Sequence, residues 1–177
     1  YNGESQGPSG AYTNRIDTYV TVEGLKDGDA LTGITLSGSR MDAGEYVITP
    51  SAAVIRGKTS NYSSIIYCEG KLTITKAPNP AVIVADAAVT KGGNTVNLSK
   101  NVKYAAGDVT YAITGEANGC KIDKNTGLFT SGDETGTCVV TVTATESANY
   151  LGTKKNITVS VEDREIVPLH VTESDIA

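Results

Sequence analysis

The sequence has few of the residues on which catalytic and cofactor sites usually depend. It contains one histidine, no tryptophan, one phenylalanine and one methionine in 177 residues. The single histidine, His170, lies in the C-terminal tail, a poor position for a base that must be held beside a serine or cysteine nucleophile. The scattered acids do not gather around a recognisable cleft, as paired glycosidase carboxylates would. We therefore expect no enzymatic activity and no bound cofactor.

The sequence also lacks a positive patch and a long apolar run. The formal net charge is −5, with acids and bases interspersed. A nucleic-acid-binding protein normally carries a basic patch or stripe, so we expect no nucleic-acid partner. No apolar run approaches transmembrane length and no signal peptide is recognisable, so we expect no membrane insertion in this fragment. We expect the signal peptide and the anchor to lie outside these residues.

The residues that are abundant favour an all-β fold. Val, Ile and Thr dominate, nine tyrosines are present, and 19 glycines supply turns. No window has helical periodicity with good helix formers, whereas short alternating segments recur. Tyr1–Gly10 is predicted as an edge strand or extended lead, residues 50–60 as a polar connection, and Lys124–Gly127 as a hairpin turn. The other predicted strands are Tyr19–Val22, Leu31–Leu36, Glu45–Thr49, Ser64–Cys68, Leu72–Thr75, Ala81–Val84, Thr95–Leu98, Val109–Ile113, Thr137–Thr145 and Asn156–Val161.

The stretch KLTITKAPNP indicates a boundary between two domains. Leu72 and Ile74 alternate with polar residues and are predicted to be buried, as the end of a hairpin with Ser64–Cys68. Two prolines then end the pairing, so Ala77, Pro78, Asn79 and Pro80 are interpreted as a short, stiff interdomain joint. Asn-Tyr steps precede the closing strand of each half, at 61–62 and 149–150, which indicates two units of similar size. The predicted domains are residues 1–77 and 78–163, and residues 164–177 form an extension or the start of a next module.

The cysteines leave two alternatives open. Cys120 and Cys138 are predicted to face the interior of the same domain. A disulfide between them would stabilise that domain by roughly 3 kcal/mol, and the alternative is two buried free thiols. Cys68 would then be an unpaired thiol packed at a strand end. No spacing of Cys and His suggests zinc.

Acidic turns are the other candidate metal ligands. Asp27-Gly28-Asp29 and Asp123–Gly127 could offer oxygen atoms to Ca²⁺, but neither has the dense ligand loop of an EF-hand. Asp and Gly are also ordinary turn residues, which is the preferred interpretation. Glu162–Glu165 is interpreted as a charged linker. We expect no metal site.

Two sets of motifs resemble repeats of bacterial surface proteins. The first half, with YNGESQ, VEGLKDGDALTGITLSG, DAGEYVIT and GKLTITKA, resembles MBG (mucin-binding-like) and YDG repeats. The second half, with VTYAITG, CKIDKNTGLFTSG and TGTCVVTVTATESANYLGTKKNITVSV, is similar to bacterial Ig-like repeats. The resemblance implies a second domain that is an Ig-like β-sandwich and a first that is Ig-like or β-grasp-like. It also implies a non-enzymatic role in a secreted or wall-attached protein.

The leading functional hypothesis is an adhesion or stalk module of a bacterial cell-surface or secreted protein. Its partners would be neighbouring repeats of the same chain, with weak binding of host glycans or glycoproteins as a further role. The alternative is a carbohydrate-binding accessory region of a larger carbohydrate-active enzyme. That alternative requires an exposed aromatic row, for which the first domain offers Tyr12, Tyr19, Tyr46, Tyr62 and Tyr67.

Overall fold

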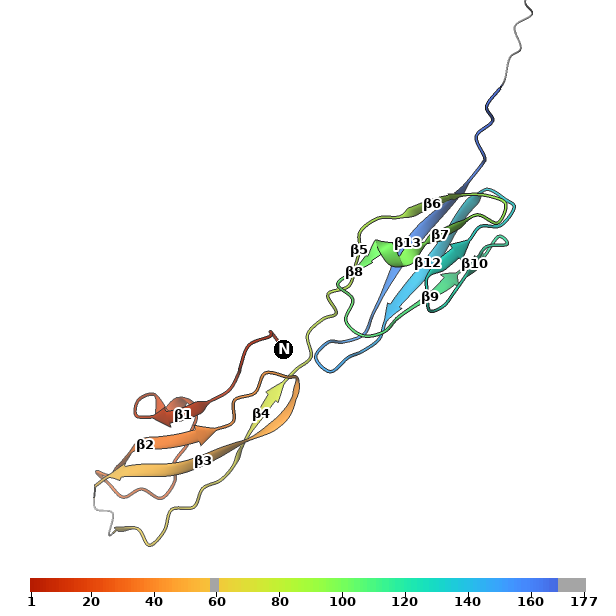
Figure 1. The fold of residues 1–177 in the computed structure, drawn as a ribbon. Coiled ribbons are helices and arrows are strands. Elements are labelled where there is room, and N and C mark those ends of the chain that lie inside the picture. Colours follow the sequence, from red (N-terminus) through yellow and green to blue (C-terminus); the bar gives the residue numbers. More distant parts are fainter. Residues whose placement is uncertain (58–60, 169–177) are drawn as a thin grey trace, which may run out of the picture. The chain divides into compact units, whose positions relative to one another are not determined.

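The computed structural model of the chain describes residues 1–57 and 61–168 (Figure 1). Its contacts divide the chain into two compact units. Unit 1 comprises Tyr1–Ala77 together with Ala148–Tyr150, and unit 2 comprises Pro78–Ser147 with the chain from Leu151 onward. Nearly all regular structure is β, which confirms the all-β prediction. Among the residues that the structure describes, no helix has the length and apolarity needed to span a bilayer.

Unit 1 contains one four-stranded sheet of order β1-β2-β3-β4 in which every pairing is antiparallel. The strands are β1 (Ser9–Tyr12), β2 (Ala30–Ser37), β3 (Gly44–Arg56) and β4 (Gly70–Ile74). The predicted strands at 31–36, 45–49 and 72–75 are therefore present. Ile34, Leu36 and Ile74 are buried, whereas Leu72, predicted to be buried, is half-buried. A single sheet of this kind has one face available for a core.

Strand β3 runs through a region that the sequence indicated as a polar connection. Residues 50–60 were expected to leave the sheet, but β3 continues to Arg56. The continuation depends on a bulge, because Ser51 pairs with Thr35 and Val54 with Gly33, so that two alanines oppose Ile34. Ala52 adopts a left-handed φ of 48° at this point. The extra residue shifts the alternation of inward and outward side chains by one position. A strict period of two therefore does not continue through β3, and the second half of the strand could not be recognised from that pattern.

Two predicted strands of unit 1 are wrong. Tyr19–Val22 is irregular chain that follows a 3₁₀ turn, η1 (Ile16–Thr18). Ser64–Cys68 does not form a hairpin with β4, because β4 pairs instead with Gly44–Ile48 of β3. Ile66 is 85% exposed. Both segments have β-forming residues, but the small sheet offers no second apolar face on which to pack them.

Unit 2 is built from three small sheets. The largest has the order β6-β13-β12-β9, the second has the order β10-β11-β7, and β5 pairs with β8. The strands are β5 (Val82–Ile83), β6 (Ala87–Thr90), β7 (Thr95–Asn97), β8 (Val102–Lys103), β9 (Val109–Thr114), β10 (Lys121–Ile122), β11 (Leu128–Thr130), β12 (Gly136–Ala144) and β13 (Thr153–Glu162). A 3₁₀ turn, η3 (Leu98–Asn101), follows β7. Strands β12 and β13 run along the length of the unit in Figure 1.

The core of unit 2 lies between these sheets. The predicted inward parity of β12 is confirmed, since Cys138, Val140, Val142 and Ala144 are all buried. Phe129 of β11, the only phenylalanine in the chain, is fully buried in the same cluster. Full burial of such a side chain contributes roughly 1.5–3 kcal/mol. The cluster further contains Val89, Leu98, Tyr111, Cys120, Ile157, Val159 and Val161.

The predicted hairpin at Lys124–Gly127 is present between β10 and β11. Gly127 has a φ of 71°, and its amide donates to the Asp123 carbonyl at 3.0 Å. A Cβ atom at this position would lie 2.9 Å from the Tyr111 ring. The glycine is therefore required for two reasons, its left-handed backbone and the close approach of an aromatic ring.

We expect Gly127→Ala to destabilise unit 2 more than Gly115→Ala does. Both glycines have positive φ, 71° and 86°, so both substitutions introduce left-handed strain of roughly 1–2 kcal/mol. No atom lies within 4 Å of a Cβ built at Gly115, whereas the ring of Tyr111 must move at Gly127, at a further cost of roughly 1–3 kcal/mol. Urea denaturation followed by near-ultraviolet circular dichroism measures the difference. Equal losses in the two variants would contradict the packing argument.

Candidate functional site

The residues of the predicted joint have different surroundings. Ala77 is the last residue of the main segment of unit 1, and Pro78, Asn79 and Pro80 begin unit 2. The Asn79 amide donates to the carbonyl oxygens of Ala106 at 2.7 Å and Leu151 at 3.1 Å. Its Oδ1 accepts from the backbone amides of Ala81 and Ala106. Asn79 is therefore a fixed part of unit 2, a role that its position between two prolines did not indicate.

The structure brings together Cys120 and Cys138. The Cys138 thiol donates to the Cys120 sulfur at 3.1 Å, and both side chains are buried. Burial, and then the contact with Cys120, raise the pKa of Cys138 to about 11. Both cysteines are free thiols in the structure, and so is Cys68. Cys68 is exposed, not packed at a strand end as expected.

Asp29 of the first acidic turn serves the local structure of unit 1. The Tyr62 hydroxyl donates to Asp29 Oδ2 at 2.6 Å, and the Asn61 amide donates to the same oxygen at 3.3 Å. The hydrogen bond to Asp29 raises the pKa of Tyr62. The tyrosine oxygen also accepts from the Lys26 amide at 2.9 Å. These bonds join the segment after residue 60 to the turn before β2, which gives the Asn-Tyr step at 61–62 a structural role.

The second acidic turn is closed by its own backbone. Asp123 Oδ1 accepts from the amides of Thr126 at 2.7 Å and Asn125 at 2.9 Å. These bonds, that from Thr126 first, lower the pKa of Asp123. The carboxylate therefore has a structural role as the acceptor of a turn. Within residues 1–57 and 61–168, no group of three His, Cys, Asp or Glu side chains is arranged to hold a metal ion.

We expect Asp123→Ala to lower the melting temperature of unit 2 at neutral pH by a few degrees, and Asp123→Asn to lower it less, because asparagine keeps an acceptor oxygen. Since folding lowers the pKa of Asp123, its contribution is present above the ordinary value of 3.8 and is lost as the pH falls through the lowered value. The gap between wild type and the asparagine variant should therefore close between about pH 5 and about pH 2. Thermal scans across this range measure it, and a constant gap would contradict the assignment.

The five candidate tyrosines of the first domain have different surroundings. Tyr62 and Tyr67 are fixed by hydroxyl hydrogen bonds, the latter accepting from the Ala53 amide at 2.9 Å. Tyr46 is half-buried, and the Arg40 guanidinium lies 5.6 Å from the centre of its ring. Tyr12 and Tyr19 form a pair whose ring centres are 5.2 Å apart, and Tyr19 is 52% exposed.

A shallow groove lies along the segment that contains Tyr19. Its apolar walls come from Ile16, Val20, Leu25 and Leu31, and Asp17 and Asp29 supply carboxylates. The apolar walls and the two acids could accept a small ligand with hydroxyl groups. Part of the lining, Val20, Thr21 and Val22, is irregular chain that the sequence indicated as a strand, and the rest includes residues of η1 and the start of β2.

Unit 2 contains a strand pairing that is absent from the sequence-based prediction. Strand β6 pairs with β13 in parallel register, with Ala87 opposite Val159 and Thr90 opposite Glu162. The Thr158 amide donates to Asp86 Oδ1 at 2.8 Å just before the paired region. We call residues 86–91 and 158–163 the parallel clamp. The alternation in AAVT, followed by the turn residues KGGN, was the available signal for β6.

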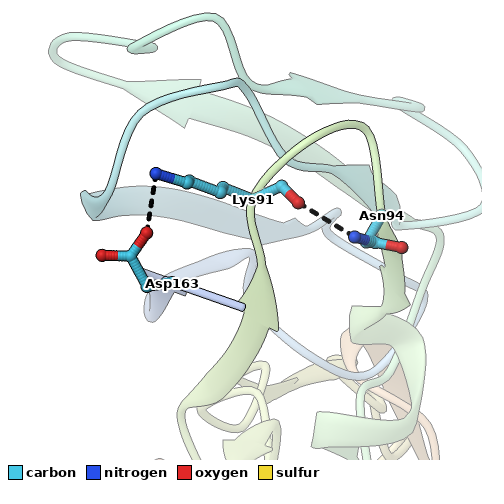
Figure 2. Close-up of polar contacts among 3 residues, drawn as sticks. All are labelled: Lys91, Asn94 and Asp163. Atoms are coloured by element: carbon cyan, nitrogen blue, oxygen red, sulfur yellow. Dashed lines mark hydrogen bonds and ion pairs between the residues drawn. The ribbon is translucent and has the colours of Figure 1, made fainter. Parts of the chain in front are cut away.

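The other end of the parallel clamp is closed by Lys91 (Figure 2). Its backbone amide donates to the Glu162 carbonyl at 2.9 Å, and its ammonium group lies 2.6 Å from Asp163 Oδ1. The Asn94 amide donates to the Lys91 carbonyl at 2.9 Å and so closes the following turn. The ion pair is solvent-exposed and contributes little on its own. Its position extends the contact between β6 and β13 by one residue on each strand.

His170 lies outside the described residues. No family model matches the chain, and no curated protein sequence matches it either. The resemblance to MBG, YDG and bacterial Ig-like repeats therefore depends on the sequence motifs alone. The geometry of the parallel clamp, and that of the groove lined by Ile16, Val20, Leu25 and Leu31, are the structural basis for a functional proposal.

Proposed function

We propose that this chain is a non-enzymatic extracellular module of a bacterial cell-surface or secreted protein, in which unit 2 serves as a tension-resistant spacer. The observation that supports this proposal is the parallel register of β6 and β13. The motifs that resemble surface-protein repeats support the extracellular setting. Neighbouring repeats of the same chain would be the partners on either side.

The parallel clamp resists tension because of its direction. The chain enters β6 at Ala87 and leaves β13 at Glu162, and the two strands run the same way. Tension applied through the chain therefore pulls the strands in opposite directions along their common axis. All hydrogen bonds between them are then loaded together. In an antiparallel pair that is entered and left at one end, the bonds would break one after another.

Unit 1 has the opposite arrangement. The amino group of Tyr1 donates to the carbonyl oxygen of Thr75, directly after β4. The two ends of this unit's main segment therefore lie side by side, and tension between them pulls outward on neighbouring residues, not along a ladder. We propose that unit 1 unfolds at a lower force than unit 2 and that its role is to present a surface.

We expect Ala87→Pro to weaken the parallel clamp, with Ala88→Pro as the matched control. The backbone N–H of Lys91 donates to β13. Backbone N–H groups of alternate residues face the same neighbouring strand, so the N–H of Ala87 also faces β13 and that of Ala88 faces away from it. Proline removes the backbone donor, and one hydrogen bond contributes about 1 kcal/mol net. At constant force, the more resistant unfolding step of the full chain should become about five-fold faster in the Ala87 variant only. Single-molecule stretching measures this rate.

The Ala87 side chain is half-buried, so proline at this position could disturb folding itself. A second pair of variants therefore tests the parallel clamp without a proline. Asp86→Ala removes only the acceptor of the Thr158 amide, and Asp133→Ala changes an exposed acid of the same unit. The Asp86 variant should also unfold faster under force, and the Asp133 variant should behave as wild type. Circular dichroism checks that all four variants are folded. Equal rates in the Ala87 and Ala88 variants would contradict the spacer proposal.

A second candidate function is weak glycan binding by unit 1, and the Tyr12–Tyr19 pair is the observation that favours it. Tyr19 presents an exposed ring on the segment that lines the groove, and sugar rings commonly pack on aromatic faces. Asp17 offers an acceptor for sugar hydroxyl groups. This arrangement is compatible both with an adhesion module and with an accessory region of a carbohydrate-active enzyme.

We expect Tyr19→Ala to weaken glycan binding about five-fold, since an aromatic contact contributes roughly 1 kcal/mol. Tyr104→Ala is the control, because Tyr104 is a 78% exposed tyrosine of unit 2. A glycan array on the full chain identifies the ligand, and calorimetric titration compares the variants. Wild-type chain that binds no glycan, or equal loss in both variants, would contradict this second function while leaving the stretching experiment unaffected.

A further inference from the structure

We propose that Cys120 and Cys138 form an intramolecular disulfide when the protein meets a disulfide oxidant. Their sulfur atoms are 3.1 Å apart, against about 2.05 Å in a disulfide, so bond formation requires an approach of about 1 Å. Both side chains are buried in one core cluster. This inference depends on the geometry of the two thiols and not on the spacer role.

The chain around Cys120 can supply the small movement that closure requires. Cys138 is fixed in the middle of the largest sheet, opposite Val159 of β13. Cys120 instead follows a turn in which Asn118 and Gly119 have φ values of 46° and 75°. That turn is exposed, and the Cys120 amide donates to the Ala117 carbonyl at 2.7 Å. Cys120 is thus the sulfur that can shift, and the one nearer to solvent.

The reaction is an ordinary thiol–disulfide exchange with a small-molecule or protein disulfide as oxidant. The thiolate of one cysteine attacks a sulfur of the oxidant and displaces one thiol, leaving a mixed disulfide. The second cysteine then attacks its neighbour's sulfur and displaces the other thiol. In total, the two cysteines lose two protons and two electrons, one Sγ–Sγ bond forms, and the oxidant disulfide is reduced to two thiols.

Burial of the two thiols explains why the folded protein should form the disulfide slowly. Both thiols are at most 5% exposed, and burial keeps Cys138 protonated at neutral pH. An oxidant therefore reaches them mainly during folding or when the turn at 117–119 opens. Once formed, the bond would be shielded from reductants in the same way. Cys68 is exposed, so it is open to competing exchange with the oxidant.

The test uses the full chain with Cys68→Ser, which removes competing exchange. The chain is unfolded, refolded in a mixture of oxidised and reduced glutathione, unfolded again without reductant and treated with a maleimide mass tag. We expect no tag and a mass lower than that of the reduced chain by two hydrogen atoms. Trypsin should then release one cross-linked pair of peptides, residues 104–121 and 125–154. Two tags, or a glutathione adduct in place of the cross-link, would overturn the proposal.

Stability provides an independent readout. The disulfide closes a short loop between residues 18 apart in sequence, so the oxidised form should melt roughly 10 °C or more above the reduced form. Reductant should abolish this shift after refolding. In the single variants Cys120→Ser and Cys138→Ser, both made in the Cys68→Ser chain, oxidant should cause no such shift. A shift of the same size in either single variant would also overturn the assignment.

Discussion

The nine-residue ladder between β12 and β13 is the interaction on which unit 2 depends. It places Cys138, Val140 and Val142 beside Ile157 and Val159, all with side chains directed into one core. The remaining strands of that sheet are attached to this ladder, β9 to β12 and β6 to β13. The parallel clamp is therefore supported by the most deeply buried part of the unit. A strand pair at the edge of a sheet resists separation only if one of its partners is itself held in place, and β13 is paired with β12 from Thr153 to Val161.

Unit 1 has no comparable ladder of buried apolar residues, and its core is correspondingly small. Its sheet buries Ile34, Leu36 and Ile74, and several of its apolar residues, such as Val47 and Val54, remain half or more exposed. A single small sheet gains little from apolar burial against the entropy of ordering its chain. Side-chain hydrogen bonds, such as that from Tyr62 to Asp29, partly compensate by joining irregular segments to the sheet. The groove is lined partly by chain of this irregular kind, at Val20, Thr21, Val22 and Leu25, where a binding surface can change without loss of a core.

The sequence was informative where side chains alternate strictly and where turn residues are chemically required. Thr137–Thr145 and the hairpin at Gly127 could be predicted because burial parity and positive φ each leave a local signal. The bulge at Ala52 removed that signal from β3, so half of a strand was interpreted as a connection. Ser64–Cys68 shows the converse, since its β-forming residues have no apolar surface on which to pack. Of the candidate site, the proximity of Cys120 and Cys138 could be predicted from parity, but the Tyr12–Tyr19 contact could not, because it depends on an irregular turn.

The parallel clamp could not be predicted from local sequence patterns for a different reason. It joins residues 72 positions apart, as in the bond from Thr158 to Asp86, and its direction depends on the path of the whole unit. Searches for motifs look for reactive side chains, and here the property that matters is the direction in which two backbones run. Ala87, Ala88 and Val89 would be equally unremarkable in an antiparallel pair entered and left at one end, whose hydrogen bonds would break one after another under tension. If unit 2 is a spacer, its function is encoded in strand order and register, so residues with no chemistry of their own determine it.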